Sequence, residues 1–95
     1  MTKEELEKIL KQGESYTVEF KRSINKEIKN EICSFVNSSG GQIFIGVGDD
    51  NTVCGIKTDN KIRSQLQTTI SAILPRPNIK IDEYVNMITM EKMSL

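Results

Sequence analysis

The spacing of apolar residues along the chain alternates between helical and extended periods. Residues 2–12 carry a narrow apolar stripe at helical spacing, and Thr2 with Glu5 forms a capping box at its start. Residues 17–21 instead alternate apolar and polar side chains, which is typical of a half-buried strand. The first part of the chain therefore predicts a helix followed by a strand.

Two further helices are predicted where apolar residues recur every three or four positions. Asn25 is placed to cap the first, and Gly40-Gly41 ends it, because glycine readily takes the left-handed conformation of a C-cap. Asp59 can cap the second helix. Residues 75–77 contain two prolines and stop that helix, since proline cannot continue a helix and restricts the residue before it.

A β-hairpin is predicted between these two helices. Residues 42–47 form a short run of β-branched and aromatic side chains bounded by glycines, which favours a buried strand. Residues 49–51 are Asp, Asp and Asn, which have the chemistry of a turn. Residues 53–56 are then expected to return as the partner strand, with two carboxylates at the tip of the hairpin.

The C-terminal part completes the predicted fold. Residues 78–85 alternate and indicate one more strand, whereas residues 86–95 have no clear pattern, although Met87, Ile88 and Met90 could pair as a strand. The element order α-β-α-β-β-α-β predicts an α/β (α+β) fold, in which helices pack against a single mixed sheet. A length of 95 residues suits one domain over residues 1–95.

Composition narrows the classes of partner and location. The formal net charge is 0, so a nucleic-acid surface would have to come from local clustering of basic residues. The charged N-terminus is unlike a signal peptide, and no apolar run approaches a membrane span, which favours a cytoplasmic protein without a membrane partner. Cys33 and Cys54, in a chain without histidine, cannot alone complete a four-ligand zinc site. Both are expected to be reduced and buried.

Nucleotide-binding motifs are absent from the sequence. Gly46-x-Gly48 follows a predicted strand but lacks the third glycine of a dinucleotide fingerprint, since position 51 is Asn, and a strand rather than a helix follows it. No G-K-[ST] sequence marks a P-loop. The chain therefore encodes no ATP-linked activity of its own.

A local cluster of basic residues lies around the predicted junction of the first strand and second helix. Its members are Lys21, Arg22, Lys26 and Lys29. Glu19, Glu27 and Glu31 lie among them, so the residues alone favour a solvated face whose charges pair. The few aromatic residues fall mostly at core positions, which argues against a platform for stacking bases.

Several motifs together resemble the Schlafen AlbA_2 domain. They are E-F-K-R at residues 19–22, F-V-N-S-S-G-G at residues 35–41, I-F-I-G-V at residues 43–47, Asp49-Asp50 and Gly55. Each motif is short, but their order and spacing match over roughly residues 14–85. The resemblance implies an AlbA-like fold. It also implies a continuation into another strand, so that the chain is cut at its C-terminus from a longer protein, one with an ATPase-like or regulatory part downstream.

The leading functional interpretation that the resemblance implies is a nucleic-acid-binding module. DNA is the expected nucleic acid, and a transcriptional or defence-type regulator is the expected context. Lys21 and Arg22 fall on the E-F-K-R motif, so with Lys26 and Lys29 they are expected to contact phosphates, in salt-sensitive binding with little choice of sequence. We favour binding without catalysis and without a cofactor.

An alternative is a metal-dependent endoribonuclease. Glu14, Glu19 and Asp49 match carboxylates that form such a site in some animal Schlafens, and three oxygen ligands suit Mg²⁺ or Mn²⁺. Five extended residues span about 16 Å, so Glu14 and Glu19 converge only if the chain folds back between them. The residues alone favour a surface pair for Glu19, exposure for Glu14 and a turn for Asp49.

A third interpretation is a non-catalytic dimerisation domain. The predicted sheet has edge strands, and an edge strand can pair with the edge of a neighbouring molecule. A homodimer is therefore a possible partner arrangement for this chain.

Overall fold

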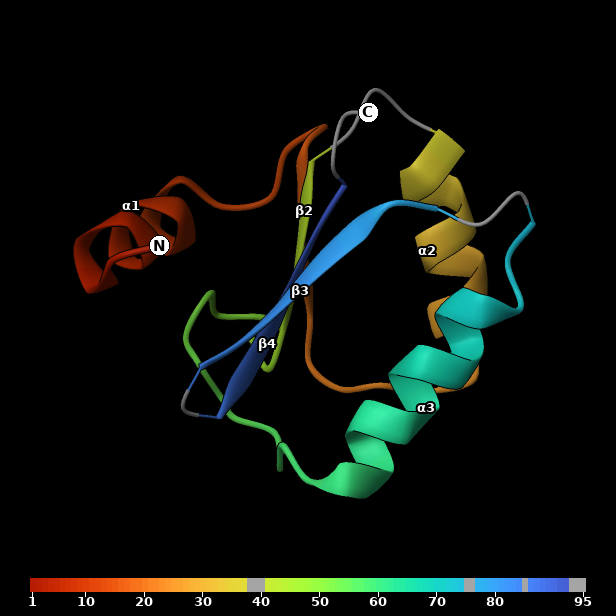
Figure 1. Ribbon diagram of the computed structural model, residues 1–95. Helices are drawn as coiled ribbons and strands as arrows, with labels where there is room; N and C mark the ends of the chain where they lie inside the picture. Colours follow the sequence, from red (N-terminus) through yellow and green to blue (C-terminus); the bar gives the residue numbers. More distant parts are fainter. Residues whose placement is uncertain (38–40, 75–76, 85, 93–95) are drawn as a thin grey trace.

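The computed structural model describes residues 1–37, 41–74, 77–84 and 86–92, in which seven elements follow one another along the chain (Figure 1). Their order is α1 (Lys3–Gln12), β1 (Val18–Lys21), α2 (Ile28–Asn37), β2 (Gln42–Ile45), α3 (Asn60–Ser71), β3 (Ile79–Tyr84) and β4 (Met87–Lys92). Within these residues, no helix is long and apolar enough to cross a membrane.

The strands form one mixed sheet in the order β1-β2-β4-β3. β1 runs parallel to β2, with Phe20 opposite Phe44, and the two remaining pairings are antiparallel. β2 and β4 are the interior strands, which explains why Ile45 and its partner Ile88 are both almost completely buried. The predicted fold class, a mixed sheet with helices packed against it, is confirmed.

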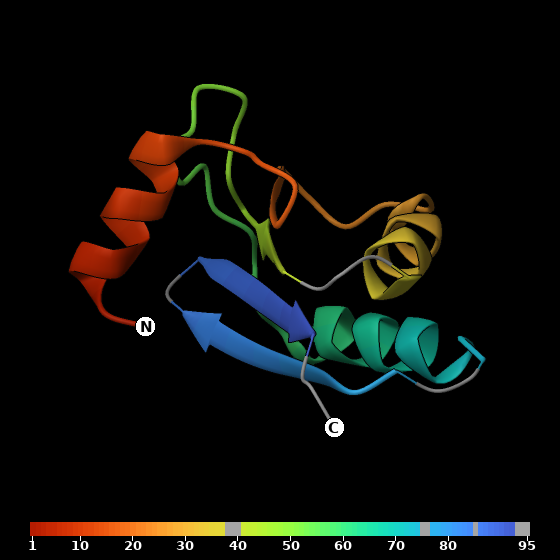
Figure 2. The ribbon, with the colours of Figure 1, turned by 90° about the horizontal axis from the view of Figure 1, so that it is seen from above.

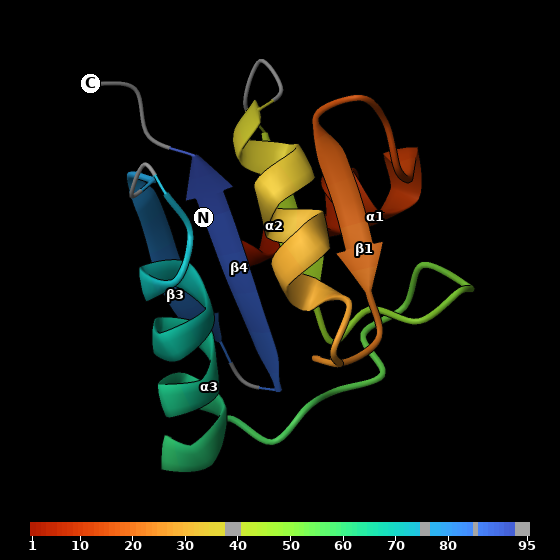
Figure 3. The same cartoon turned by 90° about the vertical axis from the view of Figure 1, so that its right-hand side faces the viewer.

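The helices cover the sheet from both sides (Figure 2). Figure 3 shows α2 and α3 side by side over one face. There, Ile43 and Ile45 pack against Ile28, Ile32 and other apolar residues of the two helices. On the opposite face, α1 packs through Leu6, Ile9 and Leu10 on a cluster that includes Phe44, Val47 and Met87. The chain thus builds three layers, with one core on each side of the sheet.

The predicted hairpin is wrong in its second strand. Residues 53–56 form only an isolated bridge between Val47 and Val53, and the antiparallel partner of β2 is β4. The backbone supplies the reason. β2 ends at Ile45, and Gly46 has a φ of 107°, which turns the chain out of the strand. Val47 therefore lies on the α1 side, although alternation predicts the side of α2.

The starts of α1 and α3 follow the predicted caps. The Thr2 hydroxyl accepts the Glu5 N–H at 3.1 Å, and the Asp59 carboxylate accepts the Ile62 N–H at 3.0 Å. The Asn25 side-chain carbonyl accepts the Glu27 N–H at 2.9 Å in a turn, but α2 begins only at Ile28, so Asn25 precedes this helix and does not cap it. The stop predicted at Gly40 lies outside the described residues, as does that at Pro75, whereas α3 already ends at Ser71.

Candidate functional site

A tight reversal of the chain immediately before β1 brings two of the predicted acidic residues together. The Ser15 N–H donates to the Val18 carbonyl at 2.9 Å, and the Val18 N–H donates back at 3.4 Å. Beyond this turn, the Phe20 N–H donates to the Glu14 carboxylate at 3.2 Å. The chain therefore folds back between Glu14 and Glu19, as the nuclease interpretation required.

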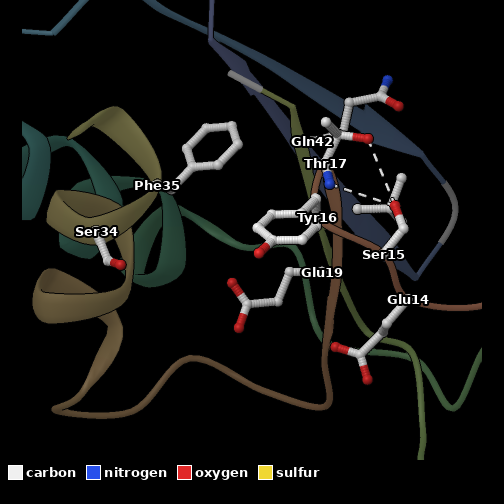
Figure 4. A pocket seen from close by; sticks show the side chains of 9 residues that line it. Glu14, Ser15, Tyr16, Thr17, Glu19, Ser34, Phe35 and Gln42 are labelled. Atoms are coloured by element: carbon white, nitrogen blue, oxygen red, sulfur yellow. Dashed lines mark hydrogen bonds between the residues drawn. The ribbon is translucent and has the colours of Figure 1, made fainter. Parts of the chain in front are cut away.

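A pocket of about 250 Å³ lies between this reversal and α2 (Figure 4). It is lined by Glu14, Ser15, Tyr16, Thr17, Val18, Glu19, Ser34, Phe35 and Gln42. Figure 4 shows the Glu19 carboxylate directed toward α2, whereas the Glu14 carboxylate lies apart from it beside β1, where it accepts the Phe20 N–H. The Tyr16 ring is fully exposed at the mouth of the pocket. This pocket is acidic, so it does not attract a phosphate by charge alone.

The third predicted carboxylate, Asp49, is exposed in the turn after β2 and does not line the pocket. Among the residues that the structure describes, no three His, Cys, Asp or Glu side chains gather closely enough to hold a metal ion. Glu14 already accepts a backbone N–H. The arrangement therefore does not fit a three-carboxylate Mg²⁺ or Mn²⁺ site.

Lys21 is held by acidic side chains. Its ammonium group forms an ion pair with Glu31 of α2 and lies 3.9 Å from the carboxylate of Glu19. The hydrogen bond to Glu31 raises the pKa of Lys21 above its ordinary value, against an opposing effect of burial. The side chain is only 27 % exposed, so the amine is partly covered as well as paired. Strand alternation does place Lys21 on the face of β1 that lies opposite the Phe20 side chain, but α2 covers the face that carries Lys21.

The remaining cations of the predicted cluster are exposed. Arg22 follows the end of β1, Lys26 lies in the turn before α2, and Lys29 lies in the first turn of α2. The Arg22 guanidinium extends toward the loop after β2 and passes close to Gly48. Lys26 and Lys29 form no ion pair within the described residues. A short connection thus presents three cations to solvent.

The loop after β2 places a carboxylate near Arg22. Its residue Asp50 accepts the Thr52 hydroxyl at 2.6 Å and the Thr52 N–H at 3.2 Å. These bonds lower the pKa of Asp50, and the Arg22 charge adds a smaller effect in the same direction. Asp50 therefore remains ionised, holding the turn and offsetting part of the Arg22 charge.

The two cysteines are free, as predicted, and differ in exposure. Cys33 is half-buried beside the core below α2, whereas Cys54 is exposed, so the prediction of two buried thiols is wrong for Cys54. The Cys54 thiol lies 3.9 Å from the Arg22 carbonyl. The loop after β2 is irregular, so its alternation carries no information about burial.

Glu31 is the residue that sequence reasoning missed. It was read as part of the solvent face of α2, whereas it turns toward β1 and compensates Lys21. One signal was available: Glu31 stands three positions after Ile28 and one before Ile32, so it borders the buried stripe.

The fold and this site define a small α+β domain with a cationic connection beside an acidic pocket. A family model for Schlafen, AlbA_2 matches residues 14–91. The chain therefore belongs to the Schlafen AlbA_2 family, which makes it a nucleic-acid-related domain at the level of the family. The match begins after α1 and includes β1, β2, β3, all but the last residue of β4, and the cationic connection.

Proposed function

We propose that this domain binds nucleic acid, with duplex DNA as the expected ligand, through the connection between β1 and α2. The observation that carries the proposal is the grouping of exposed cations at Arg22, Lys26 and Lys29 inside the family match. Exposed Lys and Arg side chains neutralise phosphates and release counterions, which gives affinity that falls steeply with salt. Because these contacts address the backbone, they confer little choice of sequence.

Lys21 has a different part in this proposal from the one that its motif suggests. Its charge is already compensated by Glu31, so a phosphate would have to displace a carboxylate to reach it. Lys21 therefore fixes the end of β1 against α2, and Arg22 beside it is the first cation to meet the ligand.

Fluorescence anisotropy with labelled duplex DNA at several salt concentrations tests this proposal. Replacing Arg22, Lys26 and Lys29 together with Ala is expected to weaken binding for every sequence and lower the log–log salt slope by about 2–3. The matched control replaces Lys3, Lys8 and Lys11 of α1, which are exposed and outside the family match, so that the net charge changes equally. Equal losses in the two triple variants would refute a localised interface.

Regulation of transcription or defence belongs to the same proposal as its biological context. In that context this domain would supply the regulator's contact with DNA. Expression of reporter genes with the triple Ala variant in place of the native residues tests that role, since a regulator that loses its DNA contact loses its effect.

Cleavage of RNA is the second function to test, because the chain reversal does bring Glu14 near Glu19. The carboxylates do not fit a three-ligand metal site, so we expect labelled RNA to remain intact with Mn²⁺. Cleavage that Glu19→Gln abolishes, while the control Glu7→Gln on α1 retains it, would overturn this expectation and establish a nuclease.

A further inference from the structure

The two edges of the sheet differ in how they are closed. At the β1 edge, the backbone groups of Val18 bond to Ser15, and the N–H of Phe20 is taken by Glu14, so the chain covers its own edge. At the β3 edge, no described segment forms a hydrogen bond with the backbone on the side away from β4. An uncovered edge strand presents unpaired N–H and C=O groups in a row. The β3 edge is thus ready to accept a strand.

A groove runs beside this edge on the face of α3. It has a volume of about 180 Å³ and is lined by Arg63, Leu66, Gln67, Ile81, Glu83 and Ile88. The side chain of Ile81 is only half-buried there, although it packs against the core. Arg63 and Glu83 form an ion pair of 2.8 Å at the rim. An apolar side chain arriving from a neighbouring strand would cover Ile81.

The charges of β3 are self-complementary about one residue. Lys80 and Asp82 lie on the opposite face from Ile81, with their charged groups 3.6 Å apart and both side chains exposed. In an antiparallel pair of β3 strands with a two-fold axis at Ile81, Lys80 of each copy lies opposite Asp82 of the other copy. The two Ile81 residues lie opposite each other. Opposite charges directly across two strands are favourable.

We propose that β3 pairs antiparallel with β3 of a second copy of this chain, about a two-fold axis at Ile81. The pairing continues one sheet through both molecules and places each Ile81 over the groove of the other copy. Lysine on an edge strand usually discourages such pairing. Here Asp82 stands at the position that compensates it in the second copy, so self-pairing brings opposite charges together while other strands meet an unmatched pattern.

Sedimentation velocity over a range of protein concentrations tests the pairing. The native chain is expected to show a reversible, concentration-dependent dimer. Asp82→Lys places two lysines opposite each other at both symmetric positions, and it is expected to raise the dissociation constant about tenfold or more. Across the strands of its own sheet Asp82 faces Thr89, but along β3 it lies beside Lys80, so the single variant also adds a repulsion within the monomer. The exchange of both charges keeps opposite charges within the strand and separates this effect from pairing.

The exchange of both charges gives the decisive result. In the double variant Lys80→Asp with Asp82→Lys, opposite charges again face each other, and the dissociation constant should return to within about threefold of the native value. Glu7→Lys on α1, where the side chain is exposed, changes the net charge by the same amount and sign as Asp82→Lys and serves as its control, and far-UV circular dichroism checks each fold. A native chain that stays monomeric, an Asp82→Lys variant that dimerises as well as the native chain, or a double variant that fails to recover dimerisation would each overturn the proposal.

Discussion

Replacing Lys21 with Met should destabilise the fold, although the sequence places Lys21 in a cluster of solvated cations. Met keeps most of the apolar stem and removes the charge, which leaves Glu31 without its partner. The two side chains are 27 % and 22 % exposed, so the pair lies between a surface pair, whose removal costs about 0.2–1 kcal/mol, and a buried pair, whose disruption costs about 3–5 kcal/mol. We expect a loss of about 1–2 kcal/mol in the free energy of unfolding.

Urea denaturation of a double-mutant cycle measures this pair directly. The single variants Lys21→Met and Glu31→Gln should each lose stability, while the double variant should lose less than their sum, with a coupling of about 1 kcal/mol. Arg22→Met is the matched control, since its side chain is exposed, and it should change stability by no more than about 0.5 kcal/mol. A coupling near zero would refute the reasoning and leave Lys21 free to bind phosphate.

Three further predictions concern the core, the backbone and the pH dependence of stability. Ile45→Ala should cost about 2–5 kcal/mol in chemical denaturation, because Ile45 is fully buried on an interior strand, and a loss below about 1 kcal/mol would contradict that placement. Gly41→Ala should cost about 2–4 kcal/mol or prevent folding, since φ is 133° and the added carbon would lie 2.8 Å from the Cα and carbonyl carbon of Thr17 and nearer still to its carbonyl oxygen; an unchanged melting temperature would contradict this packing. The pKa of Lys21 is raised in the folded state, so its stabilisation is complete below pH 10.5 and is lost as pH rises through the raised value. Alkaline unfolding should therefore be shallower in Lys21→Met than in the native chain.

The parts of the fold that depend on neighbours in sequence were predictable. Thr2 and Asp59 cap their helices because a cap needs only the next three residues of the chain. β2 was likewise predictable from a short apolar run between glycines. The partner of β2 was not predictable, because nearness in the sequence favoured residues 53–56. The actual partner, β4, lies about forty residues further along the chain and brings Met87, Ile88 and Met90 into the core.

The candidate site shows the same division between local and tertiary information. Alternation along β1 correctly separates Lys21 from Phe20, but whether the face of Lys21 meets water depends on where α2 packs. Once α2 covers that face, a cation there needs a carboxylate, and Glu31 supplies it. Arg22 escapes this constraint because it lies one residue beyond the strand, outside the cover of the helix. A motif of adjacent Lys and Arg therefore divides into one residue that holds the fold and one that remains free to meet a ligand.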